Sequence, residues 1–142
     1  MRVSDLLEPD DIHLHFNSAS IIDAVPRLLE PALTRLLHDP QAGKSIVDAV
    51  VRREQETSTR CGALALPHAR SSAVDRFVVT LGVRDETPRL IFAFVSPEGK
   101  REEHLQLLAS LARISQNAAV VNAIADAASA GDVIAALRGA GM

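Results

Sequence analysis

The sequence has few of the features that mark secreted, membrane or nucleic-acid-binding proteins. Its single cysteine, Cys61, excludes a disulfide within the chain and favours a reducing compartment. The basic residues are spread along the chain and the formal net charge is −3, which disfavours binding to nucleic acid. No apolar run approaches the roughly 20 residues of a membrane-spanning helix, and no signal-peptide pattern is present. We therefore expect a soluble, cytoplasmic protein.

Aromatic residues are also scarce. The chain has no tryptophan, no tyrosine and four phenylalanines, although 47% of its residues are hydrophobic. A core must therefore be built mainly from leucine, valine, isoleucine and alanine, which suits helices packed on a sheet. At 142 residues the chain is the size of one ordinary domain, so we expect a single domain over 1–142.

The segment DIHLHF, residues 11–16, alternates polar and apolar side chains and predicts a short strand. Such a strand would place His13 and His15 on one face, opposite Ile12, Leu14 and Phe16. With His38 the two histidines form a possible metal site. No cluster of carboxylates or cysteines at ligand spacing accompanies them, so a solvated strand face is the favoured interpretation.

Helical periodicity follows in two segments. Apolar residues recur at helical spacing over 21–37, although Pro26 and Pro31 interrupt the hydrogen-bond ladder, so we expect a kinked helix or two short ones. Helix-breaking residues over 38–44 separate this segment from a second apolar stripe, which predicts a helix over 45–55.

The second half of the chain predicts strands and then helices. ALAL, residues 63–66, is a small apolar strand, and the β-branched segments 76–83 and 89–95 predict an antiparallel hairpin because their connection is short. Further helices are expected over 101–114, 117–127 and 131–141. The first of these has a broad apolar face of Leu105, Leu107, Leu108, Leu111 and Ala112. The fold class is therefore α/β, a mixed β-sheet flanked by helices on its faces.

His68 follows Pro67 directly, at the end of the predicted strand. Spacing alone leaves four interpretations open: a core histidine, a metal ligand, an acid–base group or a nucleophile. Its place after a strand, the rigid proline before it and the basic and hydroxyl side chains around it raise the case for a functional role.

Residues 52–70, RREQETSTRCGALALPHAR, resemble the active-site segment of phosphotransferase-system enzyme IIA domains of the fructose/mannitol type, including the nitrogen-regulatory branch. In that family an Arg-Glu pair, a Ser-Thr pair and a Pro-His pair follow in order; the matching pairs are Arg53–Glu54, Ser58–Thr59 and Pro67–His68. Residues 90–114 resemble the family's second signature, a strand, a proline-containing loop and a helix opening with His104 and a leucine. The resemblance covers nearly the full chain.

The resemblance implies a phosphocarrier. His68 would accept a phosphoryl group from the carrier protein HPr or a paralogue and pass it to an enzyme IIB cysteine or use it in regulation. His104 and Arg53 match the family's other active-site residues, and Arg53 is preferred to its neighbour Arg52 because a glutamate follows it. The hydroxyls of Ser58 and Thr59 would complete the phosphoryl site, and no metal or cofactor is required.

The segment between Thr59 and His68 departs from the family, which usually carries several glycines there. This chain has Gly62 alone, and Arg60 is close enough in sequence to intrude on the site. Two other functions are therefore considered. One is a non-catalytic interaction module, derived from an enzyme IIA domain, that binds a transporter, kinase or regulator. The other is metal-dependent hydrolysis through the scattered histidines.

Overall fold

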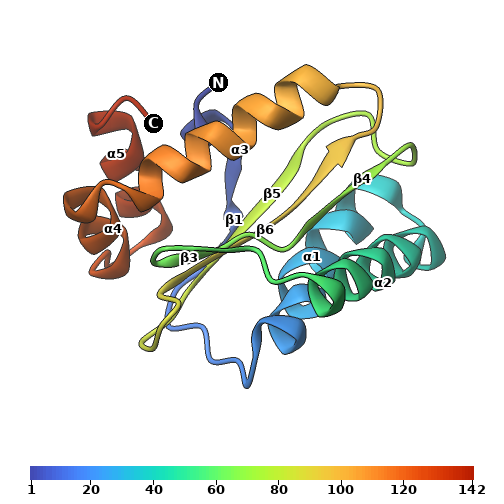
Figure 1. The fold of residues 1–142 in the computed structure, drawn as a ribbon, viewed down its shortest axis with the longest axis horizontal. Helices are drawn as coiled ribbons and strands as arrows, with labels where there is room; N and C mark the ends of the chain where they lie inside the picture. The colour runs from blue at the N-terminus through green and yellow to red at the C-terminus, as the bar shows by residue number, and fades with distance from the viewer.

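Helices cover both faces of one mixed six-stranded sheet in the computed structural model, which describes residues 1–142 (Figure 1). In chain order the elements are η1 (Val3–Asp5), β1 (Leu7–His13), α1 (Ile21–Leu37), α2 (Pro40–Glu56), β2 (Arg60–Cys61), β3 (Leu64–Ala65), β4 (His68–Ser71), β5 (Val78–Val83), β6 (Leu90–Pro97), α3 (Arg101–Ser115), α4 (Ala118–Ala125) and α5 (Ala130–Gly139). The α/β class predicted from the sequence is confirmed. None of these helices is long and apolar enough to cross a membrane.

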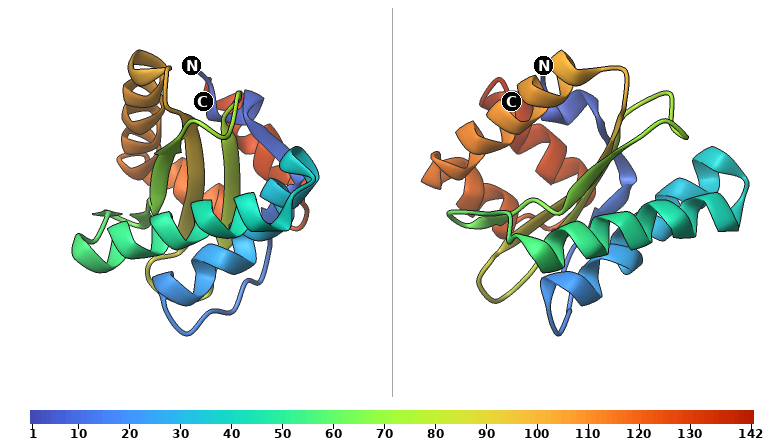
Figure 2. Two further views of the ribbon diagram at one scale, coloured as in Figure 1. Left: turned by 90° about the vertical axis from the view of Figure 1, so that its right-hand side faces the viewer. Right: turned by 45° about the vertical axis from the view of Figure 1, so that its right-hand side comes forward.

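Each face of the sheet has its own apolar core. Helices α1 and α2 pack on one face, and α3, α4 and α5 pack on the other, as the two views in Figure 2 show. Because side chains alternate along a strand, neighbouring residues of β6 enter different cores: Phe94 faces α3, whereas Val95 faces α1 and α2. The two chain ends meet, since the Ser4 hydroxyl donates to the Met142 carbonyl over 3.0 Å.

The predicted hairpin of β5 and β6 is confirmed, with antiparallel pairing from Val78 opposite Val95 to Val83 opposite Leu90. On its other side, β6 pairs in parallel first with β3 and then with β4. Pro67 lies between these two short strands and has no N–H to donate, although its carbonyl accepts from the Phe94 N–H over 3.1 Å. His68 therefore begins β4. The sequence had indicated a loop after a strand at this position, and that prediction is wrong.

The first strand was predicted too late in the chain. Strand β1 ends at His13, where the chain turns, and His15 has a left-handed φ of 52°. Pairing with β5 is irregular, because Leu7 lies opposite Val79 and Ile12 opposite Leu81. Residues 8–11 therefore leave the ladder as a bulge, which local alternation does not reveal. His13 and His15 do not share a strand face, and no three metal-ligating side chains lie together.

Helix α1 is one continuous element that contains both of its prolines, so of the two predicted alternatives the single helix is confirmed and the two short helices are not. Two other helix predictions need correction. Helix α2 begins at Pro40, because Asp39 caps it by accepting from two backbone N–H groups and proline is well tolerated at the first helical position. On α3 the buried stripe runs through Leu107, Leu111 and Ile114, and Leu105 is 55% exposed.

Candidate active site at the edge of the sheet

Two imidazoles meet on the α3 side of strand β4. His68 begins β4, and His104 lies on the first turn of α3, which packs over the same face. Their ring centroids are 5.4 Å apart and their planes are inclined by 48°. Each residue is only 6% exposed. The structure thus brings together two histidines that are 36 positions apart in the sequence.

The His68 ring is held on one side by the backbone and on one face by an aromatic ring. Its Nδ1 lies 2.6 Å from the Leu66 carbonyl oxygen. Because a carbonyl only accepts, Nδ1 carries the hydrogen and the lone pair of the neutral ring is on Nε2. The ring also stacks on Phe94, opposite it on β6, with centroids 4.7 Å apart. His68 is therefore fixed in orientation and in tautomer.

His104 is also held through its Nδ1 nitrogen. This atom lies 2.7 Å from the hydroxyl oxygen of Ser96, a residue of β6 with no solvent exposure. Neither His104 nor His68 makes a hydrogen bond through Nε2, and neither Nε2 is fully enclosed by protein atoms. Both rings are thus anchored at one nitrogen and open to an incoming group at the other.

The surroundings of the two rings keep them uncharged at neutral pH. Burial lowers the pKa of His68, an effect opposed by the Leu66 carbonyl and reinforced by the positive charge of Arg53. Burial also lowers the pKa of His104, to about 4, with further contributions from His68, Arg70 and Arg53. A neutral imidazole is the nucleophilic form, so the site favours attack by nitrogen.

Arginines from the other side of the sheet reach the same edge. Arg53 lies on the last turn of α2 and, with Arg52 and Arg70, lines an open cleft of about 450 Å³ beside β4. Of the two adjacent arginines, Arg53 is the one whose charge lowers the pKa of both imidazoles. Arg70, two residues after His68 on the same face of β4, donates to the Glu98 carbonyl. The cleft beside β4 therefore carries three arginines and one acidic residue, Glu56.

The loop that follows α2 is tied down by Glu54. This residue is 8% exposed, and its carboxylate accepts from the Thr59 hydroxyl over 2.7 Å and from the Thr59 backbone N–H over 3.3 Å. The only hydroxyl hydrogen of Thr59 is thus already donated. Ser58 is exposed and its hydroxyl makes no hydrogen bond. The side chains of the Arg-Glu pair therefore point in opposite directions, since Arg53 is exposed to solvent and Glu54 is buried.

Three residues around the imidazoles escaped the sequence analysis: Leu66, Phe94 and Ser96. The contribution of Leu66 is a backbone carbonyl, which no side-chain pattern indicates. Phe94 looks like any other core residue of an apolar strand. Ser96 had a usable signal, because it is the one polar side chain in the otherwise apolar run LIFAFVS.

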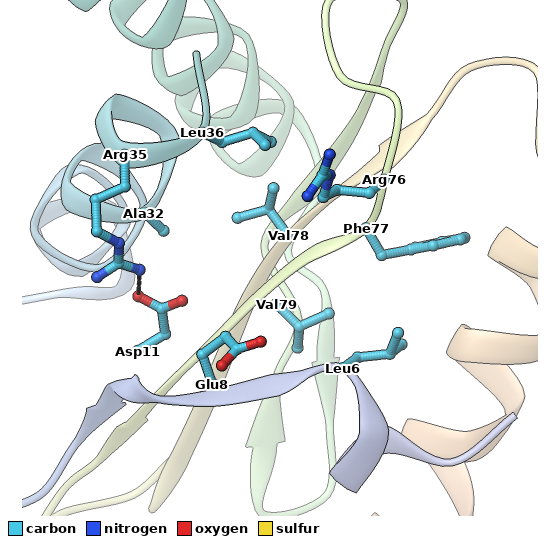
Figure 3. Close-up of a pocket in the computed structure, with 10 residues that line it drawn as sticks. All are labelled: Leu6, Glu8, Asp11, Ala32, Arg35, Leu36, Arg76, Phe77, Val78 and Val79. Carbon is cyan, nitrogen blue, oxygen red and sulfur yellow. Dashed lines mark hydrogen bonds and ion pairs between the residues drawn. The ribbon is translucent and has the colours of Figure 1, made fainter. Parts of the chain in front are cut away.

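A different cleft, of about 260 Å³, lies at the opposite edge of the sheet, between α1, β1 and β5 (Figure 3). It opens where the bulge of β1 leaves β5. There Asp11, 5% exposed, forms an ion pair with Arg35 of α1. The Asp11 carboxylate raises the pKa of Arg35. This cleft shares no residue with the one between α2 and β4.

The chain is similar to known proteins in sequence and in fold. Residues 5–139 match the family described as phosphoenolpyruvate-dependent sugar phosphotransferase system, EIIA 2. The fructose-specific EIIA component of the phosphotransferase system of Haloferax volcanii is 31% identical over 78 residues, which cover 47% of this chain and 51% of that protein. The chain thus matches about half the length of this curated relative.

Solved structures with the same fold include two from bacteria. Nitrogen regulatory protein IIA-Ntr of Neisseria meningitidis has a TM-score of 0.81 at 23% identity, covering 95% of this chain and 98% of that one. Enzyme IIA mannitol of Escherichia coli, solved in complex with phosphorylated enzyme IIB mannitol, has a TM-score of 0.72 at 21% identity, covering 94% of this chain and 97% of that one. At such identities these likenesses show the fold.

Proposed function

The chain belongs to the family of phosphoenolpyruvate-dependent sugar phosphotransferase system EIIA 2 domains, and we propose that it is a phosphocarrier that holds the transferred group on His68. In this proposal residues 1–142 act as one enzyme IIA domain. The observation that carries it is the state of His68: a buried, oriented imidazole with its hydrogen on Nδ1 and its lone pair on an open Nε2. Such a ring is prepared to attack phosphorus without first losing a proton.

The proposed transfer needs only the two imidazoles that exchange the group. The Nε2 lone pair of His68 forms the new N–P bond while the N–P bond of the donor breaks and its electron pair returns to the donor ring. The hydrogen stays on Nδ1 throughout, and Nδ1 donates it to the Leu66 carbonyl. The phosphorylated ring is therefore kept in the cationic form, a good leaving group, which suits a relay better than a store.

Positioned donors would hold the phosphoryl oxygens. The transition state spreads negative charge over three equatorial oxygens, so catalysis depends on alignment and electrostatic stabilisation. We assign His104 as one donor because its ring centroid lies 5.4 Å from that of His68. We assign the guanidinium of Arg53 as the main positive charge because its charge acts on both imidazoles. The free hydroxyl of Ser58 adds a third donor. Thr59 holds the loop through Glu54 and contributes its hydroxyl only if that bond breaks.

The partners proposed for this domain are proteins that carry a phosphoryl group. The donor is HPr or a paralogue, whose phosphohistidine supplies the N–P bond. The acceptor is the cysteine of an enzyme IIB or, in a regulatory role, a transporter or kinase that responds to the phosphorylation state. The fold that this chain shares with an enzyme IIA solved in complex with phosphorylated enzyme IIB supports the IIB assignment.

Labelling with radioactive phosphoenolpyruvate tests the proposal. The protein is incubated with enzyme I and HPr, and acid-labile, base-stable label is expected on the wild type and absent from His68→Ala. The matched control is His38→Asn, which changes an exposed histidine at the end of α1 and keeps a residue type that tolerates its φ of 53°. Full labelling of His68→Ala would contradict the proposal.

A second candidate function rests on the loop over 60–66. This loop has Gly62 alone where the family usually carries several glycines, and it is paired into the short strands β2 and β3. A domain that has lost transfer but kept its surface would act as a regulatory interaction module. The same labelling separates the two functions: no label on the wild type, together with intact binding to HPr, favours the module.

A further inference from the structure

The hydroxyl of Ser96 has a single hydrogen-bond partner. Ser96 lies on β6, next to Phe94 on the same face, and is completely buried. Its Oγ is 2.7 Å from Nδ1 of His104 and makes no other hydrogen bond. The residue opposite it on β4 is Arg70, whose side chain only donates. No acceptor other than the imidazole is therefore available to the serine hydrogen.

This geometry distinguishes the two neutral tautomers of His104. If Nδ1 carried the ring hydrogen, Nδ1 would donate to Oγ and the buried hydroxyl hydrogen would have no acceptor. Buried donors without an acceptor are rare because their loss of solvation is not compensated. If Oγ donates to Nδ1, the buried hydroxyl hydrogen has an acceptor and the ring hydrogen lies on Nε2, which is not enclosed by protein atoms. Only the second arrangement leaves no buried hydrogen without an acceptor.

We propose that Ser96 is a positioning residue: its hydroxyl donates to Nδ1 of His104 and thereby fixes that ring as the Nε2–H tautomer. The pair of imidazoles is then locked in opposite tautomers, since the Leu66 carbonyl keeps the hydrogen of His68 on Nδ1. One open nitrogen has a lone pair and the other has a hydrogen. This inference rests on the proposed function, because the value of that asymmetry is for a phosphoryl group placed between them.

The asymmetry gives the two rings different tasks at the same edge. The Nε2 of His68 attacks phosphorus, and the Nε2–H of His104 donates to an oxygen of the same phosphoryl group without transferring its proton. In the other tautomer a lone pair on His104 would face the phosphoryl oxygens and repel them. Ser96 thus allows an uncharged histidine to act as a donor, and no positive charge on His104 is needed.

Nitrogen NMR of the unphosphorylated protein tests the lock directly. In protein labelled with ¹⁵N-histidine at pH 7.5, long-range ¹H–¹⁵N spectra distinguish the two neutral tautomers by the shift of each ring nitrogen. We expect the Nε2–H pattern for His104 and the Nδ1–H pattern for His68. An Nδ1–H pattern for His104 in the wild type overturns the proposal, and this result needs no variant to fold.

Variants extend the test to transfer. Ser96→Ala should give His104 averaged nitrogen shifts and slow the labelling of His68 by phosphoramidate about tenfold to a hundredfold, the range for residues that orient a functional imidazole. Ser96→Thr, which keeps a hydroxyl, should restore both. The matched control is Thr80→Val, which removes a hydroxyl equally buried on β5 and bonded to the Ala93 carbonyl. Its labelling should stay within about twofold of wild type.

The two claims fail separately. If the wild type takes no label from phosphoramidate or from HPr, the proposed function is wrong, and the nitrogen shifts still decide for or against the serine lock. If the wild type is labelled and Ser96→Ala keeps both the Nε2–H pattern and the wild-type rate, the phosphocarrier function stands and the lock is overturned.

Discussion

At one edge of the sheet, beside β4, two histidine rings lie buried and uncharged; at the other, between α1 and β1, the carboxylate of Asp11 is buried against the guanidinium of Arg35. The first pair holds each ring by a single nitrogen and leaves the other nitrogen open. The second pair satisfies itself, because each charge is the partner of the other (Figure 3).

The imidazole pair keeps nitrogens without a hydrogen-bond partner, whereas the charges of the Asp11–Arg35 pair neutralise each other. A buried charge without a partner is costly, so a site that waits for an anion is more stable when its buried groups are neutral. Arg53, which we propose supplies the positive charge for such an anion, is exposed to water. We therefore expect changes at the imidazole edge to affect transfer, and changes at the ion pair to affect stability.

The largest effect on transfer short of removing His68 is expected from Arg53. Arg53→Gln should slow labelling of His68 about a hundredfold, the loss usual for one group that stabilises transition-state charge. The matched change Arg52→Gln, next in the chain and in the same cleft, should slow it less than about threefold. Initial labelling rates measure both, and equal losses would refute the assignment of Arg53.

At the other edge, Arg35→Ala is expected to act on folding alone. It leaves the Asp11 carboxylate buried without its partner, which should lower the free energy of unfolding by about 2 kcal/mol. Urea denaturation followed by circular dichroism measures the change. Asp11→Asn with Arg35→Ala should recover part of the loss, because the buried charge is gone. A change in the labelling rate of the folded Arg35→Ala protein would break the division between the two edges.

The imidazole edge should also make stability depend on pH. The pKa of His104 is about 4 in the folded protein and near the ordinary 6.5 when unfolded, so between these values the unfolded chain binds a proton that the folded one does not. The contribution of this ring to the free energy of unfolding is fully present above pH 6.5 and is lost as the pH is lowered toward 4. His104→Gln should flatten this part of the profile, measured by urea denaturation at each pH. An unchanged slope would show that the ring is not held neutral.

The smallest effect is expected from Ser58. Its hydroxyl is exposed and makes no hydrogen bond, so any contact with a phosphoryl oxygen competes with water. Ser58→Ala should slow labelling by about threefold or less, the equivalent of one weak hydrogen bond. Thr59→Val should instead lower stability, since it removes the bond that ties the loop to Glu54. The reverse pattern would exchange the roles given to these two residues.

Local pattern predicted most elements of this fold, and contacts between distant segments account for the errors. The hairpin of β5 and β6 and the helix α3 follow from side-chain periodicity, which a short segment carries by itself. The bulge of β1 depends on its partner strand, and the start of β4 at His68 depends on pairing with Phe94. Neither is encoded in the spacing of one segment.

The candidate site divides in the same way. Sequence motifs singled out His68 and His104. In the structure their ring centroids lie 5.4 Å apart, and their roles remain predictions. The atoms that decide which nitrogen is open, the Leu66 carbonyl and the Ser96 hydroxyl, are defined only by the folded geometry. The burial that keeps both rings neutral is likewise a property of the packed sheet and helices.

The position of the phosphoryl group on the protein tests the central claim most directly. The wild type is phosphorylated with phosphoramidate, which needs no partner protein, and the product is examined by ³¹P NMR and by tandem mass spectrometry. We predict one phosphohistidine, at His68, with phosphorus bonded to Nε2. Phosphorus on Nδ1 of His68, or on any other residue, would contradict the account.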